Sequence, residues 1–311
     1  MRVFVTGASG WIGSALVPEL LEAGHEVVGL ARSDASAGAL AAAGVEVRRG
    51  TIDDLDVLQD EAAASDGVVH LAFKHDLAFT GNFDAAADAD RRAVEAFGDA
   101  LAGSGRPLVL ASGTLVAATG TLATELDGHE PDPARPEGLN KRWETAELTL
   151  ALADRGVRSS VVRLPPTVHG DGDHGFMATI VGIARDTRVS GYIGDGANRW
   201  PATHRFDAAR VFQLAVESAP AGSTLHAVAE EGVPIRDVAE VIARHLDVPI
   251  ASIPPAQAEE HFGWIGHLLG VDGPASSALT RELLGWKPTR PGLLDDLEEG
   301  HYFERAVASA R

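Results

Sequence analysis

Cysteine is absent from this chain of 311 residues. That absence excludes disulfides, thiolate nucleophiles and metal sites built on cysteine. Aromatic residues are scarce, and the two tyrosines of the chain are Tyr192 and Tyr302. No apolar run approaches the roughly 18 residues of a membrane span, and the N-terminus lacks a basic segment followed by a cleavage site. We therefore expect a cytoplasmic protein without disulfides and without a membrane segment.

Basic residues are also few: 26 Lys and Arg stand against 45 Asp and Glu, which gives a formal net charge of −19. A surface for nucleic acid or an anionic membrane needs clustered Lys and Arg. Among the 12 histidines, no closely spaced ligand motif such as H-E-x-x-H occurs. We expect a small-molecule substrate, neither nucleic acid nor membrane as a partner, and no metal site.

The beginning of the chain carries the strongest motif. A short apolar run at 3–6 is followed by Gly7, Gly10 and Gly13, with the spacing T-G-x-x-G-x-x-G, and then by a helical pattern at 12–23. Glycines let the turn fold tightly and let a pyrophosphate approach the backbone. The N-terminus of the following helix favours the negative charge of that group. This order of strand, turn and helix predicts a dinucleotide-binding site.

Strand-like and helical patterns then alternate as far as residue 163. The predicted strands are 3–6, 26–30, 45–48, 68–71, 108–110 and 159–163, and the predicted helices are 12–23, 36–43, 55–63, 84–102 and 143–154. Such alternation indicates right-handed crossovers and a parallel sheet covered on both faces. We predict an α/β fold with a Rossmann-type doubly wound parallel sheet.

Beyond residue 163 this alternation stops. Two segments rich in Pro and Gly, 164–173 and 191–201, are predicted to be loops. Shorter helices and isolated strands follow. We expect a cofactor-binding domain at 1–168, with return segments near 200–228. A smaller C-terminal substrate lobe is expected to take most of 169–311 and to be interleaved with that domain.

With these motifs the chain resembles the extended branch of the short-chain dehydrogenase/reductase superfamily, which includes nucleotide-sugar epimerases and dehydratases. The resemblance runs nearly end to end and rests on TGASGWIG at 6–13, HLAF at 70–73, RLPPTVHG at 163–170, His204 with DAA at 207–209, and LGWKP at 284–288. It implies a dinucleotide cofactor, and a homodimer like those of many relatives. The contacts that it implies for the cofactor are Gly7, Ser9, Gly10, Trp11, Ile12, Gly13, Thr51, Ile52, Leu71, Ala72, Phe73, Pro165 and Val168.

The end of the second predicted strand bears on the choice of cofactor. NAD-binding relatives place an acid near this point, where it accepts hydrogen bonds from the ribose hydroxyls. This sequence has Ala31, followed by Arg32 and Ser33. A carboxylate would repel a 2′-phosphate, whereas a guanidinium and a hydroxyl would bind it. We therefore expect NADP rather than NAD.

The resemblance fails at the usual catalytic pair. Relatives carry a Ser or Thr after the fifth strand, then a Tyr with a Lys four residues later. Here Ser112 and Thr114 keep the first element, but Gly138 stands at the place of the Tyr and Arg142 at that of the Lys, with Lys141 beside it. The proton donor of the family is missing.

Three functions stay open. The first is an NADP-preferring reductase or dehydrogenase acting on a small or medium carbonyl-like substrate. There, Ser112 or Thr114 would bind the substrate oxygen, Lys141 or Arg142 would supply positive charge, and His169 or Tyr192 would donate the proton. Histidine is a candidate because an unperturbed imidazole exchanges protons near neutral pH. The second is an NADP-binding sensor without catalysis, and the third a nucleotide-sugar epimerase or dehydratase. We favour the oxidoreductase.

Overall fold

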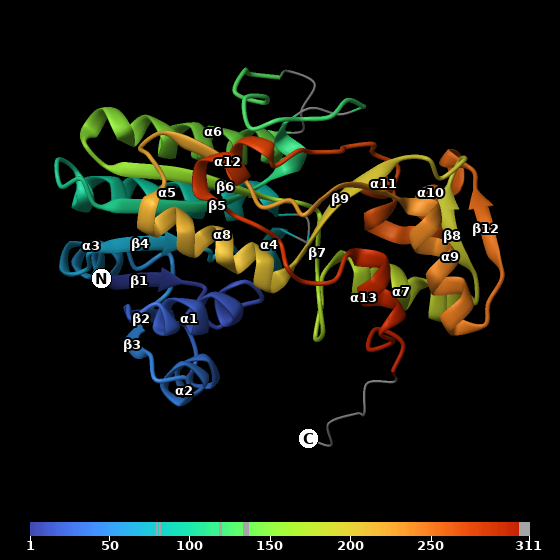
Figure 1. Cartoon of the computed structure of the whole chain (residues 1–311), viewed down its shortest axis with the longest axis horizontal. Helices are drawn as coiled ribbons and strands as arrows, with labels where there is room; N and C mark the ends of the chain where they lie inside the picture. Colours follow the sequence, from blue (N-terminus) through green and yellow to red (C-terminus); the bar gives the residue numbers. More distant parts are fainter. Residues whose placement is uncertain (79, 81, 118–119, 133–136, 305–311) are drawn as a thin grey trace.

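The computed structural model of the chain describes all residues except 79, 81, 118–119, 133–136 and 305–311 (Figure 1). Its central sheet has seven parallel strands in the order β10-β6-β5-β4-β1-β2-β3. The order of β1 to β6 is that of a Rossmann-type sheet, with β10 added at one edge. The predicted fold class is confirmed. The strands are β1 (Arg2–Thr6), β2 (Glu26–Ala31), β3 (Glu46–Arg49), β4 (Gly67–His70), β5 (Pro107–Gly113), β6 (Arg158–Leu164) and β10 (Ser223–His226).

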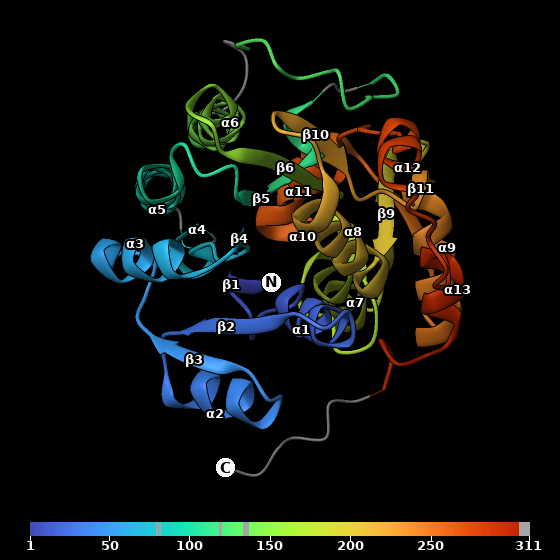
Figure 2. The ribbon, with the colours of Figure 1, turned by 60° about the vertical axis from the view of Figure 1, so that its left-hand side comes forward.

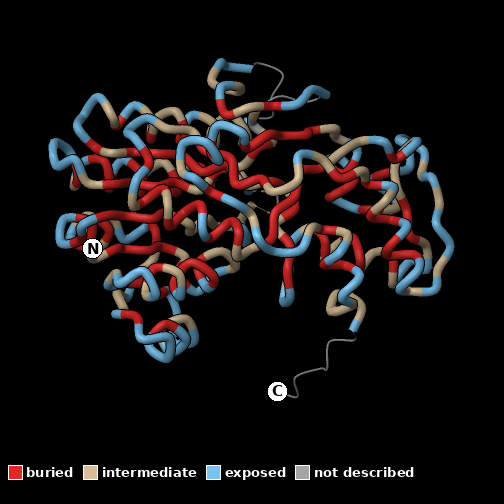
Figure 3. The backbone as a smooth tube through the Cα atoms, in the orientation of Figure 1, coloured by how far each residue is buried: buried red, intermediate tan, exposed pale blue. Residues whose placement is uncertain are grey.

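Helices cover both faces of this sheet (Figure 2). One layer contains α1 (Gly13–Glu22), α2 (Asp34–Ala42) and α8 (Arg205–Ser218), and the other contains α3 (Leu55–Ala64), α5 (Phe83–Leu101) and α6 (Glu137–Ala151). In β1, Val3 and Val5 pack into the core of the first layer and Phe4 into that of the second. Because successive strand side chains point to opposite faces, a strand covered on both sides is apolar throughout. The central strands are accordingly buried along most of their length (Figure 3).

The smaller lobe has a core of its own beside the C-terminal ends of the central strands (Figure 1). It contains a three-stranded sheet in the order β11-β9-β7 and the parallel pair β12-β8. Its strands are β7 (Thr167–His169), β8 (Ser190–Ile193), β9 (Arg199–His204), β11 (Glu230–Pro234) and β12 (Ile250–Ile253), and its helices include α7 (Phe176–Thr187), α9 (Ile235–Leu246), α10 (Ala258–Phe262), α11 (Gly266–Leu269) and α13 (Leu293–Glu298).

The chain crosses more than once between the two lobes. From β9 it returns as α8 onto the central sheet and adds β10 at the sheet edge, before β11 re-enters the smaller lobe. Later, α12 (Ala278–Leu284) packs against β10 and α8. The lobes are thus tied together by several passages of backbone, and the cleft between them is lined by segments far apart in the sequence.

Two segments predicted to be loops contain strands. The first, 164–173, includes β7, and the second, 191–201, includes most of β8 and the start of β9. Pro201 lies inside β9, where proline removes a ladder donor. It is tolerated because the partner strand β11 shifts register opposite it, between Glu230 and Val233. A β-bulge of this kind interrupts the hydrogen-bond ladder where the proline has no N–H to donate. The positions of Pro and Gly in the sequence do not reveal such a bulge.

Helix α6 begins at Glu137, six residues before the predicted start at Trp143. Gly138, Lys141 and Arg142 therefore lie on this helix rather than before it. Within the described residues, no helix has the length and apolar character needed to cross a membrane.

Candidate active site

The glycine turn between β1 and α1 is packed so closely that side chains have no room. Gly7 has a φ of +70°, and a Cβ on it would lie 2.9 Å from the backbone nitrogen of Ala72. A Cβ on Gly13 would lie 2.2 Å from the carbonyl oxygen of Gly7. Ile12 precedes the helix without a side-chain capping bond. The turn therefore offers a backbone cradle and a helix N-terminus, which fit a pyrophosphate.

The segment after β4 lies against this turn. The Thr6 hydroxyl accepts a hydrogen bond from the Ala72 N–H at 3.2 Å and lies 2.6 Å from His70 Nδ1. The Leu71 N–H donates to the Thr6 carbonyl at 3.2 Å. These bonds place Leu71 and Ala72, together with the following Phe73, along the edge where the resemblance expects the cofactor.

The end of β2 carries the residues expected to select the cofactor. The Arg32 side chain is 71% exposed and lies 3.8 Å from the Asp76 carboxylate. The Ser33 hydroxyl caps α2 by accepting from the Ser36 N–H at 3.2 Å. Arg49, which pairs in register with Ala31, donates to the Ser33 carbonyl at 2.6 Å. The sequence analysis did not predict Arg49 as a neighbour of this site. Arg49 ends β3, and the ends of neighbouring parallel strands such as β2 and β3 lie side by side.

Two hydroxyls stand at the C-terminal end of β5 and in the following turn, η1 (Thr114–Val116). Ser112 is 5% exposed and Thr114 3%. Neither Oγ atom has a hydrogen-bond partner within the part of the chain that the structure describes. Buried hydroxyls are normally hydrogen-bonded. This pair is therefore suited to bind the polar atom of a ligand.

A buried polar chain supports the end of β5. One Arg142 nitrogen donates to the Ala111 carbonyl at 3.0 Å, and another donates to the Asp90 carboxylate at 2.9 Å. Asp90 also lies 3.2 Å from His70 Nε2. Burial alone would raise the pKa of Asp90, but the Arg142 guanidinium and His70 outweigh it and lower that pKa. Arg142 is thus fixed as a cation beside the site.

A cavity of about 260 Å³ opens where the smaller lobe meets the glycine turn. The Trp11 indole N–H donates to the Val168 carbonyl at 3.0 Å and so joins the turn before α1 to β7. The residues that line the cavity come from this turn, from the region after β4 and from the segment between β6 and α7. They are Trp11, His75, Pro166, Thr167, Val168, Asp173, His174, Gly175, Phe176 and Met177. A substrate held here would lie between the two lobes.

The relationship to known proteins agrees with this geometry. The family model of the NAD dependent epimerase/dehydratase family matches residues 3–228. The chain belongs to this family. An uncharacterized protein of Schizosaccharomyces pombe is 49% identical over 304 residues, which cover 97% of this chain and 100% of the relative. A 3-diazoavenalumate denitrifying reductase of a Streptomyces species is 30% identical over 315 residues, covering 96% and 99%.

Solved structures share the fold. The dTDP-glucose 4,6-dehydratase of Streptomyces venezuelae, determined with NAD bound, superposes with a TM-score of 0.75 at 20% identity and covers 97% of this chain and 96% of its own. Membership of an epimerase/dehydratase family whose relatives include named reductases supports an enzyme of this family. The type of reaction and the substrate are taken up below.

Gly138, the residue predicted to stand in place of the family tyrosine, has little room for a side chain. Gly138 lies on α6, and a Cβ on it would stand 2.5 Å from Phe83 Cδ1. Lys141, one residue before Arg142, is held at 3.1 Å by the Asp88 carboxylate, which raises its pKa. Arg142 therefore occupies the interior position and Lys141 an outer one.

His169 is completely buried, and its contacts are those of a residue that ties two segments together. Its Nδ1 lies 2.9 Å from an Asp296 carboxylate oxygen, and its ring meets the His204 ring at 5.4 Å. Within the described residues its Nε2 has no hydrogen-bond partner. Because Asp296 engages its Nδ1 and no contact joins it to Ser112 or Thr114, His169 is left out of the proposed mechanism, and its role as a proton donor stays a prediction.

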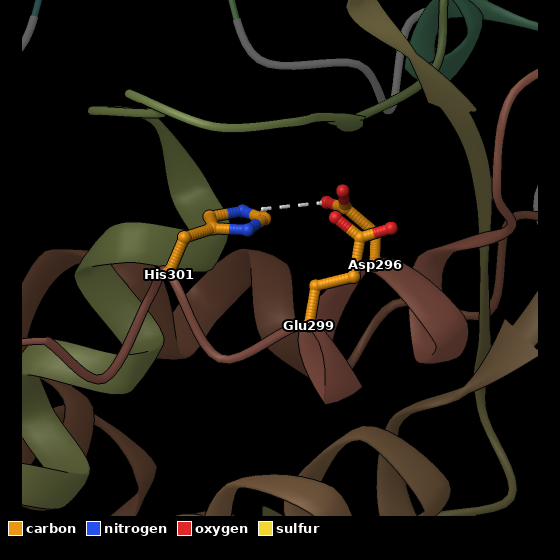
Figure 4. Close-up of side chains that lie close together, drawn as sticks. All are labelled: Asp296, Glu299 and His301. Atoms are coloured by element: carbon orange, nitrogen blue, oxygen red, sulfur yellow. Dashed lines mark ion pairs between the residues drawn. The ribbon is translucent and has the colours of Figure 1, made fainter.

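Asp296 also belongs to the one group of possible metal ligands found among the described residues: Asp296, Glu299 and His301, whose ligand atoms lie within 4.8 Å of one another (Figure 4). His301 Nε2 lies 3.7 Å from the same Asp296 oxygen that meets His169. The sequence did not single out this group, because no tight spacing motif marks it.

Tyr192 lies on β8 within the smaller lobe. The Arg236 guanidinium stands 5.6 Å from its ring centroid, and a Cβ on Gly196 would touch its ring. Tyr192 is a partly buried aromatic residue packed against the core of that lobe, and none of these contacts joins it to Thr114. Tyr192 is likewise left out of the mechanism.

The remaining predicted cofactor residues are distributed along the sheet edge. Ser9 and Gly10 are exposed on the turn, whereas Ile52 and Pro165 are buried. The Thr51 N–H and hydroxyl both donate to Asp54, which holds the end of β3 in place and lowers the pKa of that carboxyl. That these predicted cofactor residues contact a cofactor stays a prediction.

Proposed function

We propose that this chain is an NADP-preferring oxidoreductase that moves hydride between nicotinamide C4 and a carbonyl-like substrate. The observation that supports the reaction most directly is the pair of buried hydroxyls, Ser112 and Thr114, at the end of β5. Membership of the family supports a nicotinamide dinucleotide, and the named reductase among the relatives supports reduction. Cofactor preference is inferred from Ala31, at the position where NAD-binding relatives place an acid, and from the exposed Arg32 guanidinium beside it.

In this mechanism the turn Gly7–Gly13 and the N-terminus of α1 hold the pyrophosphate. Arg32 and Ser33 would hold the 2′-phosphate, and residues 71–73 would lie beside the adenosine. A nicotinamide cofactor held in this way would supply hydride chemistry. During reduction Ser112 and Thr114 donate hydrogen bonds to the substrate oxygen. The carbonyl π electrons move onto this oxygen as the carbon gains hydride, and a proton from solvent completes the alcohol.

The cofactor preference is tested by comparing dissociation constants of NADPH and NADH. We expect wild-type protein to bind NADPH more tightly and Arg32→Ala to lose about tenfold in NADPH affinity, because one charge-assisted hydrogen bond is removed. Affinity for NADH should stay the same. Arg155→Ala is the matched control, since Arg155 is also exposed and pairs with Asp99 at 2.9 Å. Tighter binding of NADH by the wild type would refute the preference.

One observation favours a second function, an NADP-binding sensor without catalysis. Gly138 stands at the position predicted for the family tyrosine, and a Cβ there would lie 2.5 Å from Phe83 Cδ1. The two functions are separated by following NADPH oxidation over a panel of carbonyls, imines and activated alkenes. Turnover supports the oxidoreductase, whereas tight NADPH binding with no turnover across the panel supports the sensor. NAD retained through purification would instead favour an epimerase or dehydratase.

A further inference from the structure

Three side chains with metal-binding atoms lie together at the end of α13. Asp296 is in the helix, Glu299 follows its last residue, and His301 comes after Gly300, which has a φ of +91°. The spacing D-x-x-E places the two carboxylates on one face of the helix. The left-handed turn at Gly300 ends the helix. Beyond this turn the His301 ring points toward the Asp296 carboxylate (Figure 4).

The distances among these side chains suit a single cation. Their ligand atoms lie within 4.8 Å of one another. His301 Nε2 lies 3.7 Å from Asp296 Oδ2, is shielded from solvent, and has no hydrogen-bond partner within the described residues. Zinc ligands lie about 2.0–2.2 Å from the ion. The exposed Glu299 side chain can rotate to close the remaining distance.

The buried Asp296 carboxylate differs from other buried acids in its partners. Asp90, which is equally buried, is bound by the Arg142 guanidinium at 2.9 Å. No Lys or Arg nitrogen of the described residues lies within 4.0 Å of Asp296, and its ion-pair partners are His169 and His301. A buried carboxylate is costly without a compensating charge. The surroundings of Asp296 therefore favour the arrival of a cation.

Glu299 adds to this demand. Its carboxylate forms no ion pair or side-chain hydrogen bond with the part of the chain that the structure describes. It stands at the C-terminal end of α13, where the helix dipole disfavours negative charge. Two like charges three residues apart on a helix also repel each other. A divalent cation between Glu299 and Asp296 would relieve both effects.

We propose that Asp296, Glu299 and His301 bind Zn²⁺, with water completing its coordination. One imidazole and two carboxylates suit Zn²⁺ better than Mg²⁺ or Ca²⁺, which take oxygen ligands. His169, whose Nδ1 lies 2.9 Å from the same Asp296 oxygen, would orient this ligand from outside the metal's own shell. The sequence analysis expected no metal site, because D-x-x-E-x-H is not a motif with an established metal.

The ion would fasten the C-terminal segment to the smaller lobe. Tyr302 follows His301, and its hydroxyl accepts from the Gly170 N–H at 3.2 Å. Arg185 on α7 donates to the Tyr302 carbonyl at 3.2 Å. Because the three ligands come together only in the folded chain, Zn²⁺ should stabilise the fold. This role is structural and goes beyond the proposed oxidoreductase function.

The test titrates Zn²⁺ calorimetrically into the full chain, freed of metal by a chelator, in the presence of excess Mg²⁺. We expect one saturable tight site and a higher thermal unfolding temperature with Zn²⁺. Glu299→Gln and His301→Gln should each weaken this binding at least tenfold, because loss of an outer partner alone costs about 10–100-fold. Glu299 is exposed, so its variant is expected to keep the fold.

Glu259→Gln and His267→Gln are the matched controls, because these side chains form a similar but exposed pair at 3.8 Å. Both should leave the Zn²⁺ affinity unchanged. The inference is overturned if no saturable site is found in excess Mg²⁺. It is also overturned if Glu299→Gln and His301→Gln leave the affinity as it is, since other histidines of the chain would then hold the ion. Neither result depends on NADPH binding or turnover, which test the proposed function.

Discussion

Gly13 shows at the scale of one residue how the cofactor turn excludes side chains. A Cβ at this position would lie 2.2 Å from the Gly7 carbonyl and within 2.7 Å of two Ala8 backbone atoms. These neighbours are main chain and cannot rotate away, so a methyl group has to displace the turn itself. The same displacement would disturb the amides that the pyrophosphate is expected to meet.

Gly13→Ala should therefore lower the free energy of unfolding by about 1–3 kcal/mol, which is typical of overpacking. NADPH affinity should fall more than tenfold. Urea denaturation and NADPH titration measure the two effects. Gly38→Ala is the control: Gly38 lies in α2, and a Cβ there has nothing within 4 Å. Since alanine favours helix, we expect that variant to gain roughly 0.5–1 kcal/mol. Similar stability changes in both variants would contradict the argument.

At the scale of elements, the C-terminal segment after α13 fastens the loop between β7 and α7. The Gly170 N–H donates to the Tyr302 hydroxyl at 3.2 Å, and that hydroxyl donates to Asp173 at 3.0 Å. Arg185 on α7 donates to the Tyr302 carbonyl at 3.2 Å. Burial and the neighbouring Asp173 raise the pKa of Tyr302, so its hydroxyl keeps its proton. The loop held in this way carries His174 into the cavity.

Tyr302→Phe removes both hydroxyl bonds and keeps the ring. We expect a loss of about 1–2 kcal/mol in the free energy of unfolding and faster hydrogen exchange in residues 170–175. Urea denaturation and exchange mass spectrometry are the measurements. Tyr192→Phe serves as the control, because the Tyr192 hydroxyl forms no hydrogen bond with the part of the chain that the structure describes. Exchange that stays unchanged in Tyr302→Phe would show that the segment does not hold the loop.

Elements built on local patterns were predictable, and those built on distant contacts were not. The strands and helices up to residue 163 follow from apolar periodicity. In contrast, β9 exists because it pairs with β7 on one side and with β11 on the other, and β7 exists because it pairs with β9. The cavity has the same origin, since the bond from Trp11 to Val168 joins residues 157 positions apart. His75 and His174 lie close to motifs in the sequence, but no local pattern predicts that both line one cavity.

At the scale of the whole molecule, buried histidines link stability to pH. His204 and His226 are 8% and 0% exposed, and burial, helped by nearby positive charge, lowers the pKa of each to about 4. In the unfolded chain their pKa is about 6.5. The unfolded state therefore binds more protons at mildly acidic pH. Stability is fully present above pH 6.5 and falls as the pH approaches 4.

Each of these histidines should cost roughly 3 kcal/mol of stability at pH 4 relative to pH 7. His226→Gln is expected to lower stability at pH 7, because His226 Nδ1 lies 2.7 Å from the Ser276 carbonyl. The informative quantity is the slope of stability against pH between 6 and 4.5, measured by urea denaturation. That slope should decrease by about 1.4 kcal/mol per pH unit, the effect of one proton.

His267→Gln is the control, because the His267 ring is exposed, and it should leave the slope of stability against pH unchanged. A slope that His226→Gln does not change would mean that His226 gains its proton equally well in the folded protein, and the acid sensitivity would have to come from carboxylates such as Asp90, whose pKa is lowered.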